Sequence, residues 1–467
     1  MSKKTFWLIS VLAVLALLIA ACGGGAAPQA EQPAEEEAAE QPAEAAEEPA
    51  EEAAEEPAEE AAEEPAEEEA MEEMAATCED ALGCVTVAPG DSLKIATALV
   101  TSGPNESLGI DTQIGVEIAI SQRGQVAGHD VELVAEDSGC SAEGGQTVAT
   151  KIASDDTILG VVGHNCSSSC TPAAPIYNDA GVTMISPSCT APALTGEGTH
   201  VESFLRTAHN DNIQGRVMAE FVYNELGLRS AATIHDGSPY AEQLQQVFAD
   251  TFAEMGGTIT AQEAVNVGDT DMRPVLTSIA TGAPELLYYP IFIAEGGFIT
   301  SQAKEIAGLE DTVLAGADGM TSPDFISAAG EASENMYLSG PDLSFENEIY
   351  ANFLTEYTEL TGGDPTAPFH AHAYDAALMI FDAIEAVAQK DADGNTLIGR
   401  QALRDALYAT SGLEGITGSI SCNEMGDCAD PQIAVSQVQG GAFVPVYQGG
   451  EILGDMAEGE AMEEDAM

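Results

Sequence analysis

Two short loops rich in hydroxyl side chains are the part of this sequence best suited to bind a small molecule. The first follows the apolar run 158–162 and includes Ser167, and the second follows the apolar run 182–185 and includes Thr190. Both runs have the composition of buried strands, and a helix is expected over 171–180 between them. In open α/β sheets, ligands bind beyond the carboxyl ends of the parallel strands. Because free N–H groups at a helix start attract anions, the two loops predict a carboxylate site.

Repeated strand and helix patterns surround these loops. Short apolar, β-branched runs alternate with segments of helical periodicity, which is typical of parallel sheets covered by helices on both faces. Roughly 350 residues exceed what a single core serves, so we expect two lobes. The expected strands are 94–100, 131–135, 158–162, 182–185, 231–235, 258–265, 285–293 and 312–315. The expected helices include 109–121, 144–154, 346–360, 369–389 and 400–409.

Three motifs make the sequence similar to a known family. Residues 163–177 read GHNCSSSCTPAAPIY, residues 184–195 read MISPSCTAPALT, and residues 101–104 read TSGP. With these motifs, 93–447 resembles the type I periplasmic binding proteins of the leucine/isoleucine/valine-binding branch, which supplies ABC importers. The resemblance implies an α/β fold of two doubly wound parallel-sheet lobes, with the ligand in the cleft between them. The three implied hinge crossings lie near 206–210, 338–343 and 418–422. The implied lobes are 91–208 plus 341–419 and 209–340 plus 420–450.

The resemblance also assigns roles to individual residues. Ser167 and Thr190 would bind the carboxylate of a free α-amino acid through their hydroxyls and backbone N–H groups. The carbonyl of Ser188 and the side chain of Asp318 would hold its ammonium group, and Tyr240 would close over it from the second lobe. The other residues implied at the site are Phe292 and Leu108, which would line an apolar pocket, and Cys166.

The chain departs from better-known members of the branch at three of these positions. Asp318 stands where they have glutamate, which is one methylene longer, and Phe292 and Leu108 replace tyrosines. An apolar pocket survives both replacements. Taken singly, the site residues also have structural explanations. The hydroxyl residues can cap helices, the carboxylate can be a turn residue beside Gly319, and the aromatic residues can belong to the core.

Enzymatic motifs are missing or incomplete. The sequence has neither a G-x-S-x-G nucleophile elbow nor a phosphate-binding G-x-x-x-x-G-K-[ST] loop. Ser301 and Lys304 form an S-x-x-K motif without an accompanying K-T-G. We therefore predict a binding protein that is not an enzyme and uses no cofactor.

Three groups of possible metal ligands have simpler explanations. The His/Cys loop 164–170 lacks a second Cys/His pair with zinc-like spacing. His370 and His372 flank the start of the expected helix 369–389. Residues 391–396 look like a calcium loop without its sixth-position glycine and closing glutamate. We predict no metal site, and metal binding is the alternative for each group.

Residues 1–22 have the three parts of a secretory signal of the lipoprotein type. Lys3 and Lys4 precede an apolar stretch, 6–21, that is short for a membrane span. Small residues then precede Cys22, which we expect to be lipidated. The predicted location is outside the cytoplasm, anchored to the cell membrane. An uncleaved anchor is the alternative.

Two acidic segments flank the part with strand and helix patterns. Residues 23–76 consist mainly of Ala, Glu and Pro and lack large apolar side chains, so we expect a disordered tether. The tail 451–467 is also acidic and expected to be disordered. The net charge is −66, and roughly forty negative charges remain without these segments. Nucleic acid is therefore excluded as a partner.

Eight of the 9 Cys remain besides the one expected to carry lipid. An even number in an exported protein favours disulfides, although sequence alone does not choose among the pairings. Local spacing suggests Cys78–Cys84 and Cys422–Cys428, and the resemblance implies Cys140–Cys166. Cys170 and Cys189 then remain, one on each of the two hydroxyl-rich loops.

Together, these features predict a lipid-anchored, monomeric receptor. It would capture a branched-chain or other apolar amino acid and deliver it to an ABC permease. One alternative is the same scaffold with a short amide, urea or another carboxylate as ligand. The other is a sensory receptor that reports its ligand to a signalling partner.

Overall fold

The computed structural model describes residues 76–448 and 451–452. The predicted signal sequence with Cys22, the predicted tether up to residue 75 and the predicted tail from residue 453 lie outside these residues. Within the described part, no helix is both long and apolar enough to cross a membrane.

A six-stranded sheet forms the centre of the first lobe, in the strand order β3-β4-β2-β5-β6-β7. Neighbouring strands from β4 to β7 are parallel, and only β3 is antiparallel. The strands expected at 94–100, 131–135, 158–162 and 182–185 are confirmed. Their bounds are β2 Leu93–Leu99, β3 Gln125–Val126, β4 His129–Asp137, β5 Ile158–Gly163, β6 Thr183–Ser186 and β7 Phe204–Arg206.

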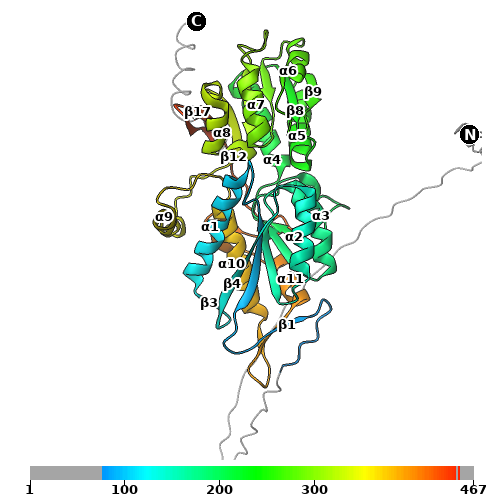
Figure 1. The fold of residues 1–467 in the computed structure, drawn as a ribbon, viewed down its shortest axis with the longest axis vertical. Helices are drawn as coiled ribbons and strands as arrows, with labels where there is room; N and C mark the ends of the chain where they lie inside the picture. Colours follow the sequence, from blue (N-terminus) through cyan, green and yellow to red (C-terminus); the bar gives the residue numbers. More distant parts are fainter. Residues whose placement is uncertain (1–75, 449–450, 453–467) are drawn as a thin grey trace, which may run out of the picture. The chain divides into compact units, whose positions relative to one another are not determined.

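Helices cover both faces of this sheet because the apolar side chains of β2 alternate in direction. Leu93 and Ile95 lie in one core with α1, α10 and α11, whereas Ala96 and Ala98 lie in another with α2 and α3. Figure 1 shows α1 and α2 on opposite sides of the sheet. The helices are α1 Glu106–Arg123, α2 Ala142–Ala153, α3 Ser167–Asp179, α9 Glu348–Thr361, α10 His370–Val387 and α11 Arg400–Tyr408.

An eight-stranded sheet forms the second lobe, in the order β19-β18-β17-β12-β11-β10-β8-β9. The strands from β9 to β12 are parallel, and β17, β18 and β19 are added as an antiparallel edge. Its strands are β8 Ser230–His235, β9 Thr258–Ala264, β10 Leu286–Tyr288, β11 Val313–Ala317, β12 Tyr337–Pro341, β17 Ile433–Gln439, β18 Ala442–Gln448 and β19 Glu451–Ile452. Its helices are α4 Asp211–Glu220, α5 Pro239–Glu254, α6 Arg273–Ala280, α7 Ile293–Ala303 and α8 Pro323–Ala329, with the short η2 Phe221–Glu225, η3 Asp318–Met320 and η4 Gly330–Ser333.

Smaller elements complete the first lobe. The strands β1 Cys84–Val87, β14 Thr396–Gly399 and β13 Gln389–Lys390 form one small sheet, and β15 Leu413–Gly415 pairs with β16 Gly418–Ile420. The short helix η1 Pro192–Thr195 follows the second hydroxyl-rich loop. The chain passes to the second lobe between β7 and α4, returns between β12 and α9, and passes again between β16 and β17.

Several sequence-based boundaries differ from the structure, and three of the differences have a clear cause. The strand expected over 285–293 ends at Tyr288, because Pro290 has no N–H for the sheet. The helix expected from residue 171 begins at Ser167, since the Cys166 carbonyl accepts N–H bonds from Ser169 and Cys170. The predicted tail starts two residues too early, because 451–452 pair with β18 as β19.

The predicted limits of the lobes remain a proposal, and contacts around β7 argue for one adjustment. The N–H of Cys428 donates to the Arg206 carbonyl, and the N–H of Arg206 donates to the Gly426 carbonyl. Residues 420–428 therefore lie against the first lobe. We propose that the third crossing begins after Cys428 rather than near residue 420.

The buried position of Leu93 generates a prediction about stability. Its side chain is 0% exposed at the start of β2, so Leu93→Ala should lower the free energy of unfolding by about 2–5 kcal/mol, as lost burial plus a cavity. Leu360→Ala is the matched control, because Leu360 is 60% exposed, and it should change stability by less than about 0.5 kcal/mol. Urea unfolding followed by circular dichroism measures both. Equal losses in the two variants would contradict this packing.

Candidate functional site

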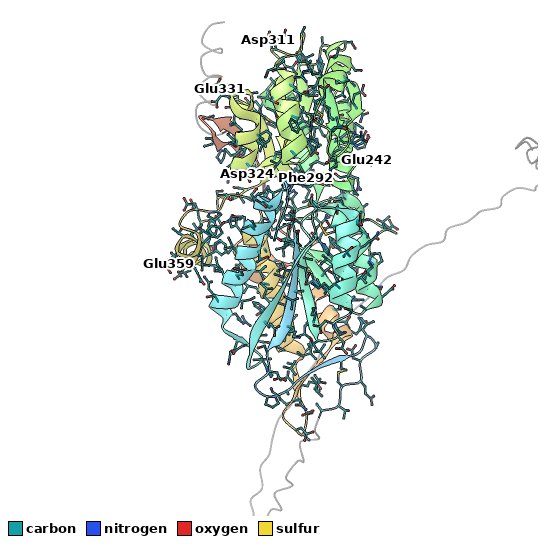
Figure 2. The ribbon with its side chains drawn as sticks, viewed as in Figure 1. Glu242, Phe292, Asp311, Asp324, Glu331 and Glu359 are labelled. Atoms are coloured by element: carbon teal, nitrogen blue, oxygen red, sulfur yellow. A yellow bond between two sulfur atoms is a disulfide. The ribbon has the colours of Figure 1, made fainter. Side chains whose placement is uncertain are left out.

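A small cavity lies where the two lobes meet, and it gathers the residues that the sequence singled out. It is lined from the first lobe by Leu108, Asn165, Cys166, Ser167, Ser188 and Phe369, and from the second by Tyr240, Phe292, Asp318 and Gly319. The space measures about 330 Å³, open solvent at its mouth included. Figure 2 labels Phe292 at the level where the lobes meet. Seven of the eight predicted site residues line the cavity. The eighth, Thr190, is fully buried and lies two residues after Ser188 in the sequence.

The first lobe contributes hydroxyl groups held by backbone contacts. Ser167 is the first residue of α3, and its Oγ accepts the Ala191 N–H at 3.2 Å. The Oγ of Ser188 donates to the Asn165 carbonyl at 2.9 Å. The Thr190 Oγ1 is buried and has no partner among the described residues. This side therefore offers hydroxyls and a helix start, the features that bind a carboxylate.

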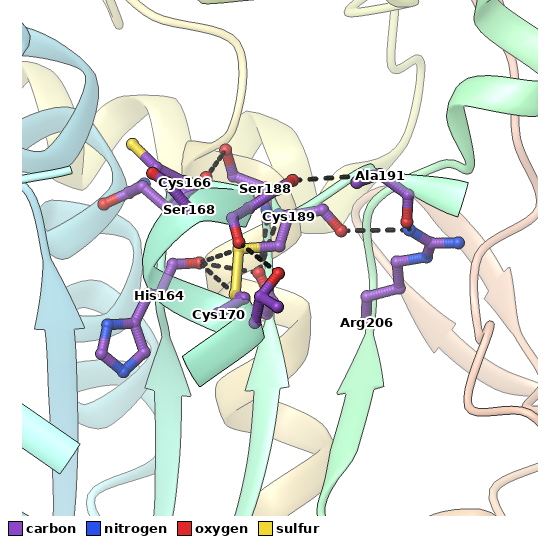
Figure 3. Close-up of a disulfide and its surroundings, with 12 residues drawn as sticks. His164, Cys166, Ser168, Cys170, Ser188, Cys189, Ala191 and Arg206 are labelled. Carbon is purple, nitrogen blue, oxygen red and sulfur yellow. Dashed lines mark hydrogen bonds between the residues drawn. A yellow bond between two sulfur atoms is a disulfide. The ribbon is translucent and has the colours of Figure 1, made fainter. Parts of the chain in front are cut away.

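Disulfides fix this side of the cavity. The disulfide Cys170–Cys189 joins α3 to the loop that carries Ser188 and Thr190 (Figure 3). The disulfide Cys140–Cys166 anchors the residue immediately before Ser167. The structure also contains Cys78–Cys84 and Cys422–Cys428, the two bridges that local spacing suggested. Cys140–Cys166 is the bridge that the resemblance implied, and the fourth bridge joins the two cysteines left over. Since Cys166 and Cys170 are both bridged, the alternative of a zinc site at 164–170 is wrong.

The second lobe contributes a buried carboxylate. Asp318 follows β11 in η3 and is 4% exposed. Its Oδ1 accepts the Gln214 Nε2–H at 2.6 Å and the Tyr240 hydroxyl at 3.2 Å. Burial raises the pKa of Asp318 to about 6, against the opposing effect of these hydrogen bonds. None of the residues lining the cavity is Lys or Arg, so no side chain at its wall neutralises this charge.

A second carboxylate, Asp211, was missed by the sequence analysis. It is the first residue of α4, is 0% exposed, and neither side-chain oxygen has a hydrogen-bond partner among the described residues. Burial and the charge of Asp318 raise its pKa well above the ordinary value, although the charge of Arg206 and the nearby Thr190 hydroxyl oppose this shift. Its N–H donates to the Thr190 carbonyl at 3.0 Å. An acidic residue directly after the first crossing was the available signal, but it also fits an ordinary helix start.

The remaining wall of the cavity is apolar. Leu108 is 8% and Phe369 is 4% exposed. The rings of Tyr240 and Phe292 lie 5.3 Å apart, centroid to centroid. Phe369 was not predicted as a site residue, because the sequence places it only at the start of a long helix. Such walls suit an apolar side chain of the ligand.

The other proposed metal ligands have protein partners. His370 Nδ1 contacts Asp111 Oδ2 at 3.0 Å, and Asp391 accepts N–H bonds from Asp393 and Asn395 within its own turn. Burial lowers the pKa of His372 to about 3, so its imidazole is neutral at physiological pH. In the part of the chain that the structure describes, no group of three His, Cys, Asp or Glu side chains is arranged to hold a metal.

Known proteins are similar to this chain over most of its described part. A family model described as periplasmic binding protein matches residues 92–442. A leucine-, isoleucine-, valine-, threonine- and alanine-binding protein from Pseudomonas aeruginosa is 32% identical over 340 residues, which is 72% of this chain and 87% of the relative.

Solved structures share the fold. A leucine-binding protein from Thermotoga maritima MSB8 superposes with a TM-score of 0.69 at 26% identity, over 76% of this chain and 98% of that one. A solute-binding protein of an ABC transporter from R. palustris, in complex with benzoate, gives a TM-score of 0.65 at 19% identity, over 78% and 98% of the two chains. The second likeness is one of fold alone.

The raised pKa of Asp318 predicts a pH-dependent difference in stability between the ligand-free protein and its Asp318→Asn variant. Because the folded-state pKa is about 6 and the ordinary value is 3.8, the protonated carboxyl stabilises the fold below about pH 4. This contribution is lost as the pH rises through 6. The free energy of unfolding of the parent, minus that of the variant, should therefore fall by about 2–2.5 kcal/mol between pH 4 and pH 8, because the unfolded carboxyl is already partly ionised at pH 4.

Urea unfolding at several pH values measures this difference. A difference that does not change with pH would show that Asp318 is not a buried, ionisable group in the folded protein.

Proposed function

Because the chain belongs to the leucine/isoleucine/valine-binding family of type I periplasmic binding proteins, we propose that it binds a small apolar α-amino acid in the cavity between its lobes. The family consists of solute-binding receptors of ABC transporters rather than enzymes. Each part of an α-amino acid has a matching wall in the cavity.

The unneutralised carboxylate of Asp318 is the observation that carries the proposal. A buried charge without a partner is costly, and a ligand ammonium supplies the missing partner. A plain carboxylate or an uncharged amide would leave Asp318 without a cation.

The opposite wall suits the carboxylate of the same ligand. The Ser167 hydroxyl and the N–H groups at the start of α3 supply hydrogen-bond donors there, and we propose the same role for the Thr190 hydroxyl, which lies near the Asp211 carboxyl. Leu108, Phe292 and Phe369 then leave an apolar space for the side chain.

Contacts between the lobes support binding by hinge closure. The Oγ atoms of Ser107 and Ser322 lie 3.0 Å apart across the cleft, and the Ala193 N–H donates to the Gln243 Oε1 at 2.9 Å. An amino acid that touches both lobes would favour the closed arrangement over the open one. A permease that recognises the closed receptor would then receive the ligand.

The remaining parts of the proposal concern the location of the protein. We propose that lipidation of Cys22 anchors a monomeric receptor to the outer side of the cell membrane, with 23–76 as a tether. The lobes would comprise 91–208 plus 341–419 and 209–340 plus 420–450, with the adjustment near residue 420 described above.

Asp318→Asn tests the ligand class, because it keeps the shape of the side chain and removes its charge. Leucine binding should weaken by about 2–5 kcal/mol, the range for removing one member of a buried charge pair. Asp324→Asn is the matched control: Asp324 is exposed on α8 of the same lobe, and its replacement should leave affinity unchanged. Calorimetry is the appropriate method, since the only tryptophan, Trp7, lies in the predicted signal sequence.

Two results would sink the amino-acid proposal. One is an Asp318→Asn variant that binds leucine as tightly as the parent. The other is a parent that binds only urea, short amides or carboxylates without an amino group, in which case the alternative ligand class takes over.

The same carboxylate makes ligand binding depend on pH. The ammonium group requires ionised Asp318, whose pKa is raised to about 6 by burial, so leucine affinity should fall as the pH drops below about 6. The decrease should approach tenfold per pH unit well below that value. Calorimetric titrations from pH 4 to 8 check this, and the Asp318→Asn variant should lack the dependence. A pH-independent affinity in the parent would exclude Asp318 as the ammonium partner.

A further inference from the structure

A buried guanidinium lies directly behind the loop that carries Ser188 and Thr190. The side chain of Arg206, at the end of β7, is 0% exposed. Its Nη1 donates to the carbonyls of Cys189 and Ala191, both at 3.1 Å, and its Nη2 donates to Thr195 Oγ1 at 2.6 Å. The two carbonyls belong to the residues on either side of Thr190. Arg206 thus holds the peptide group that precedes Thr190 and the carbonyl of the residue that follows it.

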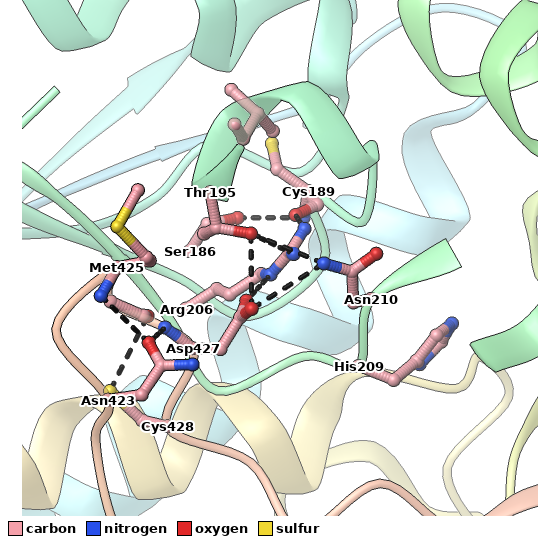
Figure 4. Close-up of polar contacts among 12 residues, drawn as sticks. Ser186, Cys189, Thr195, Arg206, His209, Asn210, Asn423, Met425, Asp427 and Cys428 are labelled. Carbon is pink, nitrogen blue, oxygen red and sulfur yellow. Dashed lines mark hydrogen bonds and ion pairs between the residues drawn. The ribbon is translucent and has the colours of Figure 1, made fainter. Parts of the chain in front are cut away.

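The counter-ion of Arg206 comes from a distant part of the chain. Asp427 Oδ1 accepts the Arg206 Nε–H at 2.5 Å, and Asp427 Oδ2 accepts the Thr195 hydroxyl at 3.1 Å (Figure 4). Asp427 lies within the small loop closed by Cys422–Cys428. Backbone bonds at Gly426 and Cys428 attach this loop to β7. The disulfide therefore restricts Asp427 to a position next to the guanidinium of Arg206.

We propose that Arg206 and Asp427 are positioning residues for ligand binding: they hold the loop 187–195 in the conformation that presents Ser188 and Thr190 to the ligand. The inference rests on the proposed function for its ligand, and neither residue lines the cavity. The planar guanidinium, with several donors in a fixed fork, can hold adjacent carbonyls in one geometry. A lysine would offer a single point charge there.

The same contacts connect the ligand loop to two of the three crossings. Arg206 ends the last strand before the first crossing, and Asp427 precedes the third. The Thr190 carbonyl also accepts the Asp211 N–H at the start of α4. The Arg206 side chain is fully buried, whereas that of Asp427 is 28% exposed. Removing Asp427 would leave a buried guanidinium without its counter-ion, which is costly. The role of the ion pair here is to specify one loop conformation next to the hinge.

Asp427→Ala tests the proposal, because it removes an acceptor from Arg206 without touching the cavity. Hydrogen–deuterium exchange of the full mature protein should be several-fold faster in peptides covering 187–195. In calorimetry, the leucine Kd should rise about tenfold, the size of effect seen for residues that orient ligating groups, while the fraction of active protein stays the same. Asp427→Asn restores an acceptor without the charge and should give intermediate values.

Glu424→Gln is the matched control, since Glu424 is exposed in the same disulfide loop, and it should behave as the parent in both measurements. Unchanged exchange of 187–195 in Asp427→Ala would overturn the proposal. So would a variant whose active fraction falls while its Kd stays the same, because that is the signature of a merely structural role. If the parent does not bind leucine, the proposed function fails, and the exchange measurement alone still decides whether Asp427 holds the loop.

Discussion

A carboxylate buried without a cation is the constraint on which the candidate site depends. Asp318 is almost inaccessible, and the described walls of its cavity contain no basic residue. Gln214 and Tyr240 donate hydrogen bonds to it but bring no charge. Burial thus opposes ionisation of Asp318 in the ligand-free state. A ligand that supplies a positive group would relieve this cost, which is the physical basis of the proposed preference for an amine.

The first lobe differs from the second, because it holds neutral hydrogen-bonding groups in fixed positions. Ser167 begins α3, whereas Ser188 and Thr190 lie on the loop 187–195. Cys170–Cys189 joins α3 to this loop, Cys140–Cys166 holds the start of α3, and Arg206 binds the carbonyls of Cys189 and Ala191. Preorganised donors lose less entropy when the ligand binds. The two lobes therefore have complementary roles, since one provides charge and the other provides directed hydrogen bonds.

Much of the fold could be predicted because its signals are local. The β-branched runs around β2, β4, β5 and β6 and the amphipathic helices are recognisable within short windows of sequence. The errors arose where backbone bonding overrode pattern: Pro290 ended a strand early, and the Cys166 carbonyl started α3 before its prolines. The predicted site residues at 166–167 and 188–190 lie within motifs specific to the family, whereas the others came only from the resemblance. Asp211, Phe369 and Arg206 were missed as site residues because their importance comes from contacts between distant segments, such as Arg206 with Asp427, which no local pattern reports.

The central claim is that the cavity recognises both charged groups of an amino acid at once. The most direct test is a calorimetric comparison of leucine with 4-methylpentanoate, which lacks the amino group, and with leucinamide, which lacks the carboxylate. The account predicts that leucine binds well and that both analogues bind at least about thirtyfold more weakly, since each loses charge-assisted hydrogen bonds. An affinity for 4-methylpentanoate equal to or greater than that for leucine would contradict the account, because Asp318 would then have no cation to bind.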